Sequence, residues 1–251
     1  MFHVKICGVT TPEDALLAIA AGADCIGLNF VPGSPRQLDG ATGRSIRAAV
    51  PADVAVVGVF AGATADQIRR TAEVVGLDAI QLHGHLAAET DAAGAVMSGP
   101  VDPPELCRDL APLPVIRAVR LEAAPPDGDP LASARRWVAA ARLLGHPPVM
   151  AIVDASVSRG TTAGQLGGTG AVVDWAALAR TKPLDIPMAL AGGLAPENVA
   201  AAIAACGLQA VDTASGVEAA PGRKDAEKLR RFVAAARGAM HSAGAPLRGC
   251  R

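Results

Sequence analysis

The residues whose types and spacing most clearly suit catalysis lie near the start of the chain, in Lys5-Ile6-Cys7-Gly8. Apolar Val4 and Ile6 alternate with Lys5 and Cys7, and alternate residues of a β-strand point to opposite faces. The pattern therefore predicts a strand on which Lys5 and Cys7 share a face, with the thiol at its carboxyl end. Such a cysteine can act as a general base when nearby cations favour its thiolate. A buried structural cysteine is the alternative interpretation.

A second candidate for proton transfer is Asp154, which follows the apolar run 149–153. The run predicts a buried strand that ends at the carboxylate. Desolvation favours the protonated form of a carboxyl group, and this form suits a general acid. A helix cap or a turn aspartate is the alternative, but the Ser/Thr/Gly-rich stretch after Asp154 offers no immediate helix to cap.

Two glycine-rich turns in the last third of the chain could bind an anion. Gly192-Gly193 precedes a helix predicted to begin at Pro196, and Ser215-Gly216 precedes the last predicted helix. Glycine lets backbone N–H groups approach an anion closely, and a helix N-terminus adds partial positive charge. These turns are therefore candidates for a phosphate site, with ordinary tight turns as the alternative.

Four further residues are candidates for binding or tuning, and each has a second interpretation. Arg36 lies in a proline-stiffened loop, and its guanidinium could hold a carboxylate or simply face solvent. His83 is included among the substrate contacts, although it could be a satisfied histidine at the rim. Lys5 could tune Cys7, or it could pair with Asp212 inside the fold.

Short β-rich runs alternate with helical stretches along the whole chain. The strand candidates are Val4–Cys7, Cys25–Phe30, Val54–Phe60, Ala79–His83, Val115–Leu121, Val149–Asp154, Met188–Ala191 and Ala210–Ala214. The helix candidates are Pro12–Ala21, Gly40–Val50, Ala65–Val75, Pro104–Leu110, Leu131–Leu144, Trp175–Thr181, Pro196–Ala205 and Ala226–Met240. About eight βα units in this length predict an α/β fold, a single (β/α)8 TIM barrel with a closed parallel sheet.

The barrel prediction brings the candidate residues together, because the carboxyl ends of all eight strands meet at one rim. A doubly wound open sheet is the competing architecture. It would need a glycine-rich dinucleotide turn after the first strand, and Gly8-Val9-Thr10-Thr11-Pro12 is not one. We expect one domain over residues 1–251, with loop insertions near 86–103 and 155–169.

Composition excludes several classes of function. The net charge is −1 and aromatic residues make up 2% of the chain, which argues against nucleic-acid binding. No apolar run approaches the ~20 residues of a membrane span, and the first residues do not form a signal peptide. Five widely spaced cysteines without a CxxC pair argue against disulfides and structural zinc. A cytoplasmic protein without a metal site is expected.

Taken together, the motifs resemble the phosphoribosylanthranilate isomerase family of tryptophan biosynthesis, in order and over nearly the whole chain. They are Lys5-Ile6-Cys7-Gly8, Gly33-Ser34-Pro35-Arg36, Gln81-Leu82-His83-Gly84, Gly167-Gly168-Thr169-Gly170 with Asp174-Trp175, Ala191-Gly192-Gly193-Leu194, and Asp212 with Ser215-Gly216-Val217-Glu218 through Pro221-Gly222 to Lys224-Asp225.

The resemblance implies an Amadori rearrangement of N-(5-phosphoribosyl)anthranilate to 1-(2-carboxyphenylamino)-1-deoxyribulose 5-phosphate, without a cofactor. It implies that Asp154 is the general acid and Cys7 the general base. Arg36 would hold the anthranilate carboxylate, Asp212 a sugar hydroxyl and the glycine turns the phosphate. The only partner expected is this sugar-phosphate substrate, and the chain is expected to be a monomer or a homodimer.

Three features depart from the family pattern. Ala171-Val172-Val173 stands where the family usually has a basic residue and Thr-Phe, and the segments after Asp154 and after the fourth strand are longer than usual. They concern loop closure and turnover rate more than the reaction. Two alternatives stay open. The related isomerase of histidine biosynthesis has an aspartate at the position of Cys7, and a degenerate barrel would bind a sugar phosphate without converting it.

Overall fold

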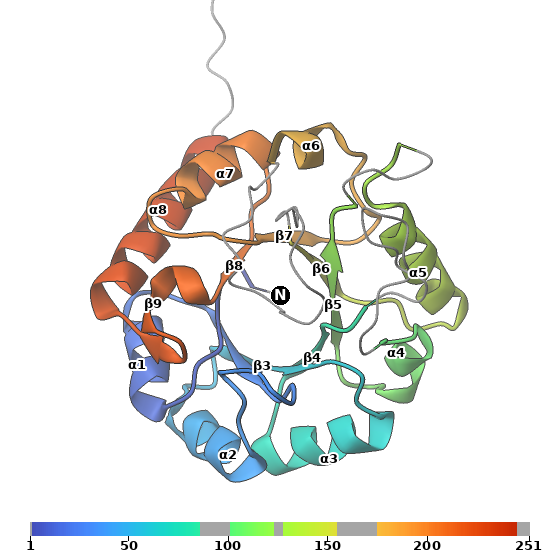
Figure 1. Ribbon diagram of the computed structural model, residues 1–251, viewed down its shortest axis with the longest axis horizontal. Helices are drawn as coiled ribbons and strands as arrows, with labels where there is room; N and C mark the ends of the chain where they lie inside the picture. The colour runs from blue at the N-terminus through green and yellow to red at the C-terminus, as the bar shows by residue number, and fades with distance from the viewer. Residues whose placement is uncertain (1, 86–100, 123–127, 155–174, 245–251) are drawn as a thin grey trace, which may run out of the picture.

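The computed structural model describes residues 2–85, 101–122, 128–154 and 175–244. Eight parallel strands form a closed barrel in chain order, and the last strand pairs with the first (Figure 1). The strands are β1 (Val4–Cys7), β2 (Cys25–Asn29), β3 (Ala55–Phe60), β4 (Ala79–Leu82), β5 (Val115–Arg120), β6 (Met150–Asp154), β7 (Met188–Ala191) and β8 (Val211–Thr213). The predicted closed parallel barrel is confirmed.

Helices surround the barrel on the outside (Figure 1). They are α1 (Pro12–Ala20), α2 (Gly40–Ala49), α3 (Ala65–Val75), α4 (Glu105–Asp109), α5 (Ala132–Leu143), α6 (Trp175–Arg180), α7 (Val199–Cys206) and α8 (Ala226–Gly244). α8 packs against both α7 and α1, and so closes the helical layer where the chain ends meet. No helix in the described ranges is both long and apolar enough to cross a membrane.

Each strand alternates between the helical layer and the barrel interior. On β1, Val4 and Ile6 join the large apolar core beneath the helices, whereas Lys5 and Cys7 face inward. On β6, Ala151 and Val153 face the helices, so Asp154 points to the interior at the strand end. The period of two read from the sequence therefore places both proton-transfer candidates on the inner face.

Local sequence signals explain where several helices begin and end. The Thr11 hydroxyl caps α1 by accepting a hydrogen bond from the backbone N–H of Asp14, at 3.1 Å. Thr64 and Gln67 form a capping box at the start of α3, and Gly76 ends that helix in the left-handed conformation. These devices fix the short loops that return the chain to the next strand.

One predicted boundary in the last third of the chain is wrong, and one feature there was not predicted. α7 begins at Val199 rather than Pro196, because the Asn198 side chain accepts from the Ala195 N–H and donates to the Gly193 carbonyl, which holds these residues in a turn. The chain between β8 and α8 is not a simple loop. It forms a short 3-10 helix (Ser215–Val217) and a hairpin of β9 (Glu218–Ala220) and β10 (Arg223–Lys224).

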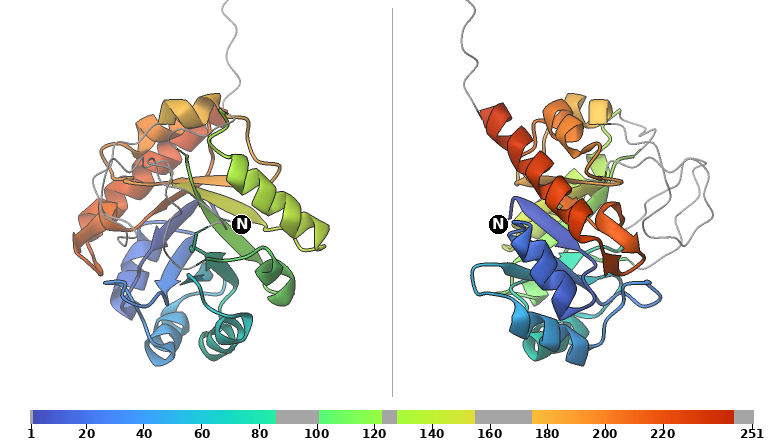
Figure 2. Two further views of the ribbon diagram at one scale, coloured as in Figure 1. Left: turned by 45° about the vertical axis from the view of Figure 1, so that its right-hand side comes forward. Right: turned by 90° about the vertical axis from the view of Figure 1, so that its left-hand side faces the viewer.

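The predicted insertions fall mostly outside the described ranges, as do Ala171-Val172-Val173. Val101 and Asp102, at the end of the first insertion, are described and lie against the barrel. Val101 forms a bridge with His85, and the Asp102 carboxylate is fully buried. Side views show β9 and β10 beyond the carboxyl end of β8, next to α1 (Figure 2).

Candidate active site

Cys7 ends β1 at the inner face of the barrel, beside an internal ion pair. Lys5 Nζ lies 2.8 Å from Asp212 Oδ1, and the Lys5 side chain is fully buried. Although burial alone would lower the pKa of Lys5, the Asp212 carboxylate and then Cys7 raise it, so the lysine stays charged. Lys5 thus pairs with Asp212, which is one of the two roles that the sequence left open.

Gly27 on β2 provides the room for this arrangement. It lies opposite Cys7 in the sheet, and a Cβ atom at Gly27 would lie 2.7 Å from Cys7 Sγ and 3.1 Å from Lys5 Nζ. No real Cβ tolerates the first distance. The absence of a side chain at Gly27 therefore lets the thiol and the ammonium group share one space.

Arg36 reaches the same end of the barrel, where it is held by Glu218 of β9. Arg36 Nε donates to Glu218 Oε1 at 2.7 Å and Nη2 donates to Oε2 at 2.6 Å, a two-point ion pair. The Arg36 guanidinium is therefore mostly buried and paired with a carboxylate, and it is not a solvated surface charge. The hydrogen bonds that Arg36 donates to Glu218 raise the pKa of Arg36, and the charge of Arg36 interacts with Cys7.

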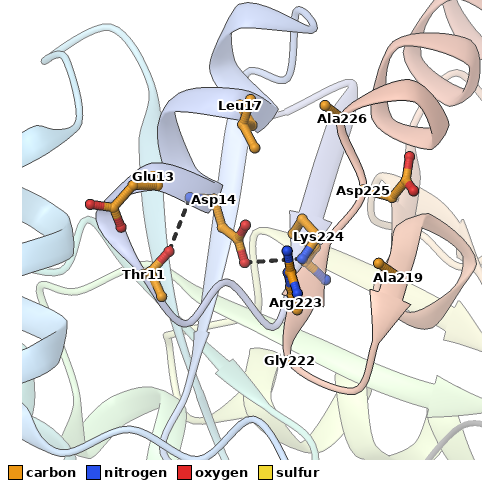
Figure 3. A pocket seen from close by; sticks show the side chains of 10 residues that line it. All are labelled: Thr11, Glu13, Asp14, Leu17, Ala219, Gly222, Arg223, Lys224, Asp225 and Ala226. Carbon is orange, nitrogen blue, oxygen red and sulfur yellow. Dashed lines mark hydrogen bonds between the residues drawn. The ribbon is translucent and has the colours of Figure 1, made fainter.

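Lys224 of β10 joins Glu218 to the backbone at Cys7. Its Nζ donates to Glu218 Oε1 at 3.0 Å and to the Cys7 carbonyl at 2.7 Å, and its side chain is fully buried. Its backbone N–H donates to Asp14 Oδ2 at 3.0 Å, which ties β10 to α1 (Figure 3). Cys7 thus has three cations around it, Lys5, Arg36 and Lys224, and interacts electrostatically with each of them.

Asp154 lies across the barrel at the end of β6, in a small pocket of about 20 Å³ that His83 and Arg120 also line. Arg120 is opposite Asp154 in the register of β5 and β6. Asp154 and Cys7 thus both face the interior at the carboxyl ends of their strands. A substrate in the barrel mouth could contact both groups, as acid–base catalysis from two sides requires.

His83 is half-buried and forms a 3.3 Å hydrogen bond between its Nδ1 and Gln81 Nε2. Burial, followed by the charges of Arg120 and Arg117, lowers the pKa of His83 from 6.5 to about 3. The imidazole is therefore neutral at physiological pH. It can donate or accept a hydrogen bond, but it cannot supply a positive charge to an anion.

The two glycine turns lie against each other, as a shared anion site requires. A Cβ at Gly216 would lie 1.9 Å from the carbonyl oxygen of Leu194, so only glycine permits this approach. The Thr213 hydroxyl donates to the same carbonyl at 2.7 Å. Gly192 and Gly193 both have positive φ angles, 93° and 61°. The turns after β7 and β8 are thus locked together at the carboxyl end of the barrel.

A buried ion pair that the sequence did not suggest supports the rim near His83. The Asp102 carboxylate accepts from the backbone N–H groups of Gly62, at 2.7 Å, and Gly84, at 2.6 Å, and from Arg117 Nη1, at 3.3 Å. Arg117 also donates to two carbonyls of the β4 end and stacks over the ring of Trp137, 5.0 Å from its centroid. This cluster fastens the ends of β3, β4 and β5 together.

A second hollow lies outside the barrel wall, and Lys224 and Asp14 are among the residues that line it. It is a groove of about 630 Å³ between α1 and the β9–β10 hairpin, and Figure 3 shows the side chains that line it. Its volume exceeds that of the pocket at Asp154, but it contains no predicted site residue. Within the described ranges, no three His, Cys, Asp or Glu side chains gather as a metal site would require.

Comparison with known proteins decides the family. The family model for N-(5'phosphoribosyl)anthranilate (PRA) isomerase matches residues 4–98 and 137–235. An N-(5'-phosphoribosyl)anthranilate isomerase of Myxococcus xanthus is 39% identical over 235 residues, covering 94% of this chain and 96% of its own. The chain belongs to the phosphoribosylanthranilate isomerase family. It is an isomerase of tryptophan biosynthesis, as the resemblance predicted.

Solved structures of the family share the fold. Phosphoribosyl anthranilate isomerase in complex with reduced 1-(o-carboxyphenylamino)-1-deoxyribulose 5-phosphate aligns with a TM-score of 0.69 at 31% identity, covering 95% of this chain and all of that one. Monomeric forms of the dimeric Thermotoga maritima enzyme align with the same TM-score, identity and coverage. The family model leaves residues 99–136 unmatched, and this stretch contains α4, β5 and the ion pair of Asp102 with Arg117.

Sequence reasoning missed three charged residues of this isomerase's barrel mouth. Glu218 and Lys224 stood inside a quoted motif but were given no role, and Arg120 was not considered. The signal for Arg120 was available, since it sits at a strand end in the same position as Asp154. Nothing in the sequence pairs Glu218 with Arg36, because the two residues are 182 positions apart.

Proposed function

We propose that the carboxyl end of the barrel converts N-(5-phosphoribosyl)anthranilate to 1-(2-carboxyphenylamino)-1-deoxyribulose 5-phosphate, with Asp154 as the acid and Cys7 as the base. The observation that carries this assignment is the placement of the two groups. Both point into the barrel mouth from strand ends, and the thiol lies among three cations. A family member is described in complex with a reduced form of this product.

The proton movements balance without a cofactor. Asp154 gives its proton to the ribose ring oxygen, the bond from that oxygen to C1 breaks, and the anilino nitrogen forms an iminium with C1. Cys7, as the thiolate, removes the proton from C2, and its bonding pair forms the C1–C2 double bond of an enolamine. Proton gain at C1 and proton loss from the C2 hydroxyl then give the ketone, with the same atoms as the substrate.

The remaining groups bind the two ends of the substrate. Arg36 holds the anthranilate carboxylate, because a guanidinium matches a carboxylate with two parallel hydrogen bonds. The turns at Gly192-Gly193 and Ser215-Gly216 hold the phosphate. Asp212 keeps one oxygen on Lys5 and uses the other for a sugar hydroxyl. Neutral His83 contacts the substrate beside Asp154.

We further propose that residues 1–251 form one domain in the cytoplasm and that the enzyme is a monomer or a homodimer. Continuous pairing of all eight strands supports a single unit, because no strand can leave the barrel without opening it. The Thermotoga maritima relative is described as dimeric, which keeps the homodimer open for this chain.

Loss of substrate fluorescence tests the catalytic roles, with the next synthase of the pathway present to remove the product. Cys7→Ala and Asp154→Ala should each reduce turnover by at least ~10²-fold while the binding of a reduced product analogue persists. Cys206→Ala and Asp185→Ala serve as matched controls, since Cys206 contacts the Trp175 carbonyl and Asp185 pairs with exposed Arg142. Full activity in either test variant would disprove the role of that residue.

A further inference from the structure

The three residues Arg36, Glu218 and Lys224 form a continuous chain of contacts that returns to Cys7. Arg36 grips both oxygens of Glu218, and Lys224 joins Glu218 Oε1 to the Cys7 carbonyl. The stem of Arg36 passes directly over Gly8, where a Cβ would lie 2.3 Å from Arg36 Cδ. The carboxylate-binding group and the general base are therefore tied to the same stretch of backbone.

Burial shows which member of the chain faces the substrate. The side chains are 0% exposed for Lys224, 4% for Glu218 and 14% for Arg36. Arg36 is the outermost of the three, and Glu218 occupies the guanidinium edge formed by Nε and Nη2. The other edge, formed by Nη1 and the second hydrogen of Nη2, contacts no acceptor in the described part of the chain. It is directed away from Glu218 and can take a second carboxylate.

Charge supports the same division of labour. Two cations and one carboxylate leave the group with one net positive charge, which matches one substrate carboxylate. Without Glu218, two buried cations would face each other, and no acceptor would fix the rotation of the Arg36 side chain. Glu218 thus supplies orientation at the cost of part of the attractive charge.

We propose that Glu218, anchored by Lys224, is a positioning residue that presents the outer edge of Arg36 to the substrate's ring carboxylate and so aligns the substrate with Cys7. This rests on the proposed role of Arg36 in binding that carboxylate. Glu218 does not touch the reacting atoms in this assignment. Its effect should therefore depend on whether the ligand carries the ring carboxylate.

Two ligands and two variants test this dependence. The ligands are reduced 1-(o-carboxyphenylamino)-1-deoxyribulose 5-phosphate and its phenylamino counterpart, which lacks the carboxylate. Glu218→Gln removes the charge and keeps the shape, whereas Glu218→Asp keeps the charge and withdraws the carboxylate by one methylene. Glu197→Gln is the matched control, because Glu197 forms an exposed ion pair with Arg231. Dissociation constants are measured by calorimetry, together with KM and kcat.

Both Glu218 variants should bind the carboxylated ligand about 10-fold more weakly and the phenylamino ligand within about twofold of the native affinity. KM should rise in parallel. Equal weakening of both ligands would overturn the proposal, since it would mean that Glu218 only stabilises the fold. Tighter or unchanged binding of the carboxylated ligand by Glu218→Gln would also overturn it, because net charge would then outweigh orientation. If Glu218→Gln does not fold, Glu218→Asp decides.

Arg36→Met separates failure of this inference from failure of the proposed function. If Arg36→Met keeps the native preference for the carboxylated ligand, Arg36 does not bind the carboxylate and both assignments fall. If Arg36→Met loses the preference while both Glu218 variants keep it, Arg36 has its proposed role and only the positioning role of Glu218 is wrong.

Discussion

The ammonium group of Lys5 lies 2.8 Å from Oδ1 of Asp212, inside a barrel where the lysine side chain has no exposed surface. The two residues face each other on β1 and β8, the first and last strands of the barrel. A pair in this position is costly to break, because removal of one partner leaves a desolvated charge without compensation.

Lys5→Met should therefore lower the free energy of unfolding by about 3–5 kcal/mol, measured by urea denaturation. The double variant Lys5→Met with Asp212→Asn should recover part of this loss, since it removes both charges. Arg231→Met, which breaks the exposed pair with Glu197, should cost less than about 1 kcal/mol. If Lys5→Met loses as little unfolding free energy as Arg231→Met, the pair of Lys5 with Asp212 does not have the stabilising role expected of a desolvated ion pair.

His83 should make the protein less stable in acid. Its pKa is lowered from 6.5 to about 3 in the folded state, so between these values the unfolded chain binds a proton that the folded chain excludes. The free energy of unfolding should fall as the pH drops from 6.5 towards 3, by at most about 1.4 kcal/mol per pH unit from this group. His83→Gln should show a shallower decline in urea titrations between pH 7 and 4. If the free energy of unfolding declines equally with falling pH in the native protein and in His83→Gln, His83 is not the source of the acid sensitivity.

Gly27→Ala should reduce turnover more than it reduces stability. The new methyl group would meet Cys7 Sγ at 2.7 Å and displace the thiol, whereas overpacking of this kind costs about 1–3 kcal/mol. We expect at least a ~10-fold loss in kcat, since misplacement of a proton-transfer group by a fraction of an ångström is expensive. Gly238→Ala is the matched control, because Gly238 is an exposed position of α8 where a Cβ would meet nothing within 4 Å. Native kcat in Gly27→Ala would show that the thiol has room to move.

Asp102→Asn should weaken the rim beside His83. An asparagine cannot accept with both terminal atoms, so one of the N–H groups of Gly62 and Gly84 loses its acceptor and Arg117 loses its counter-charge. Loss of a buried partner predicts a destabilisation of about 3–5 kcal/mol. Asp109→Asn, at a partly exposed pair with Arg108, is the control in the same thermal or urea assay. Equal losses of stability in Asp102→Asn and Asp109→Asn would contradict a stabilising role for the buried pair of Asp102 with Arg117.

The sequence predicted the barrel well because its strands carry strong local signals. Val4–Cys7 and Met188–Ala191 were predicted with the bounds that the structure has, since apolar residues alternate or run together between clear turn residues. Most other boundaries differ by one or two residues, as fraying ends allow. The convergence of Cys7 and Asp154 at one rim followed from the topology alone.

The hairpin and the ion pairs could not be predicted in the same way. β9 and β10 have three and two residues, too few for any periodicity to show. Glu218 and Lys224 are polar and would be expected at the surface. Their burial is tolerated because Glu218 accepts from both Arg36 and Lys224, and Lys224 also donates to the Cys7 and Ala214 carbonyls. Asp102 likewise follows an insertion with no internal pattern. Such pairings depend on contacts between residues far apart in the sequence, which local propensities do not encode.

The pairing of β1 with β8 has a consequence for folding during synthesis of the protein. Cys7 emerges from the ribosome among the first residues, whereas Asp212, Glu218 and Lys224, which surround it in the finished barrel, emerge more than 200 residues later. Contacts so distant along the chain slow folding, because a long loop must close before they contribute. A nascent chain therefore carries Cys7, Lys5 and Arg36 before it carries Asp212 and Glu218, the carboxylates that pair with those two cations. A prematurely terminated chain has the general base but not the residues that position its surroundings.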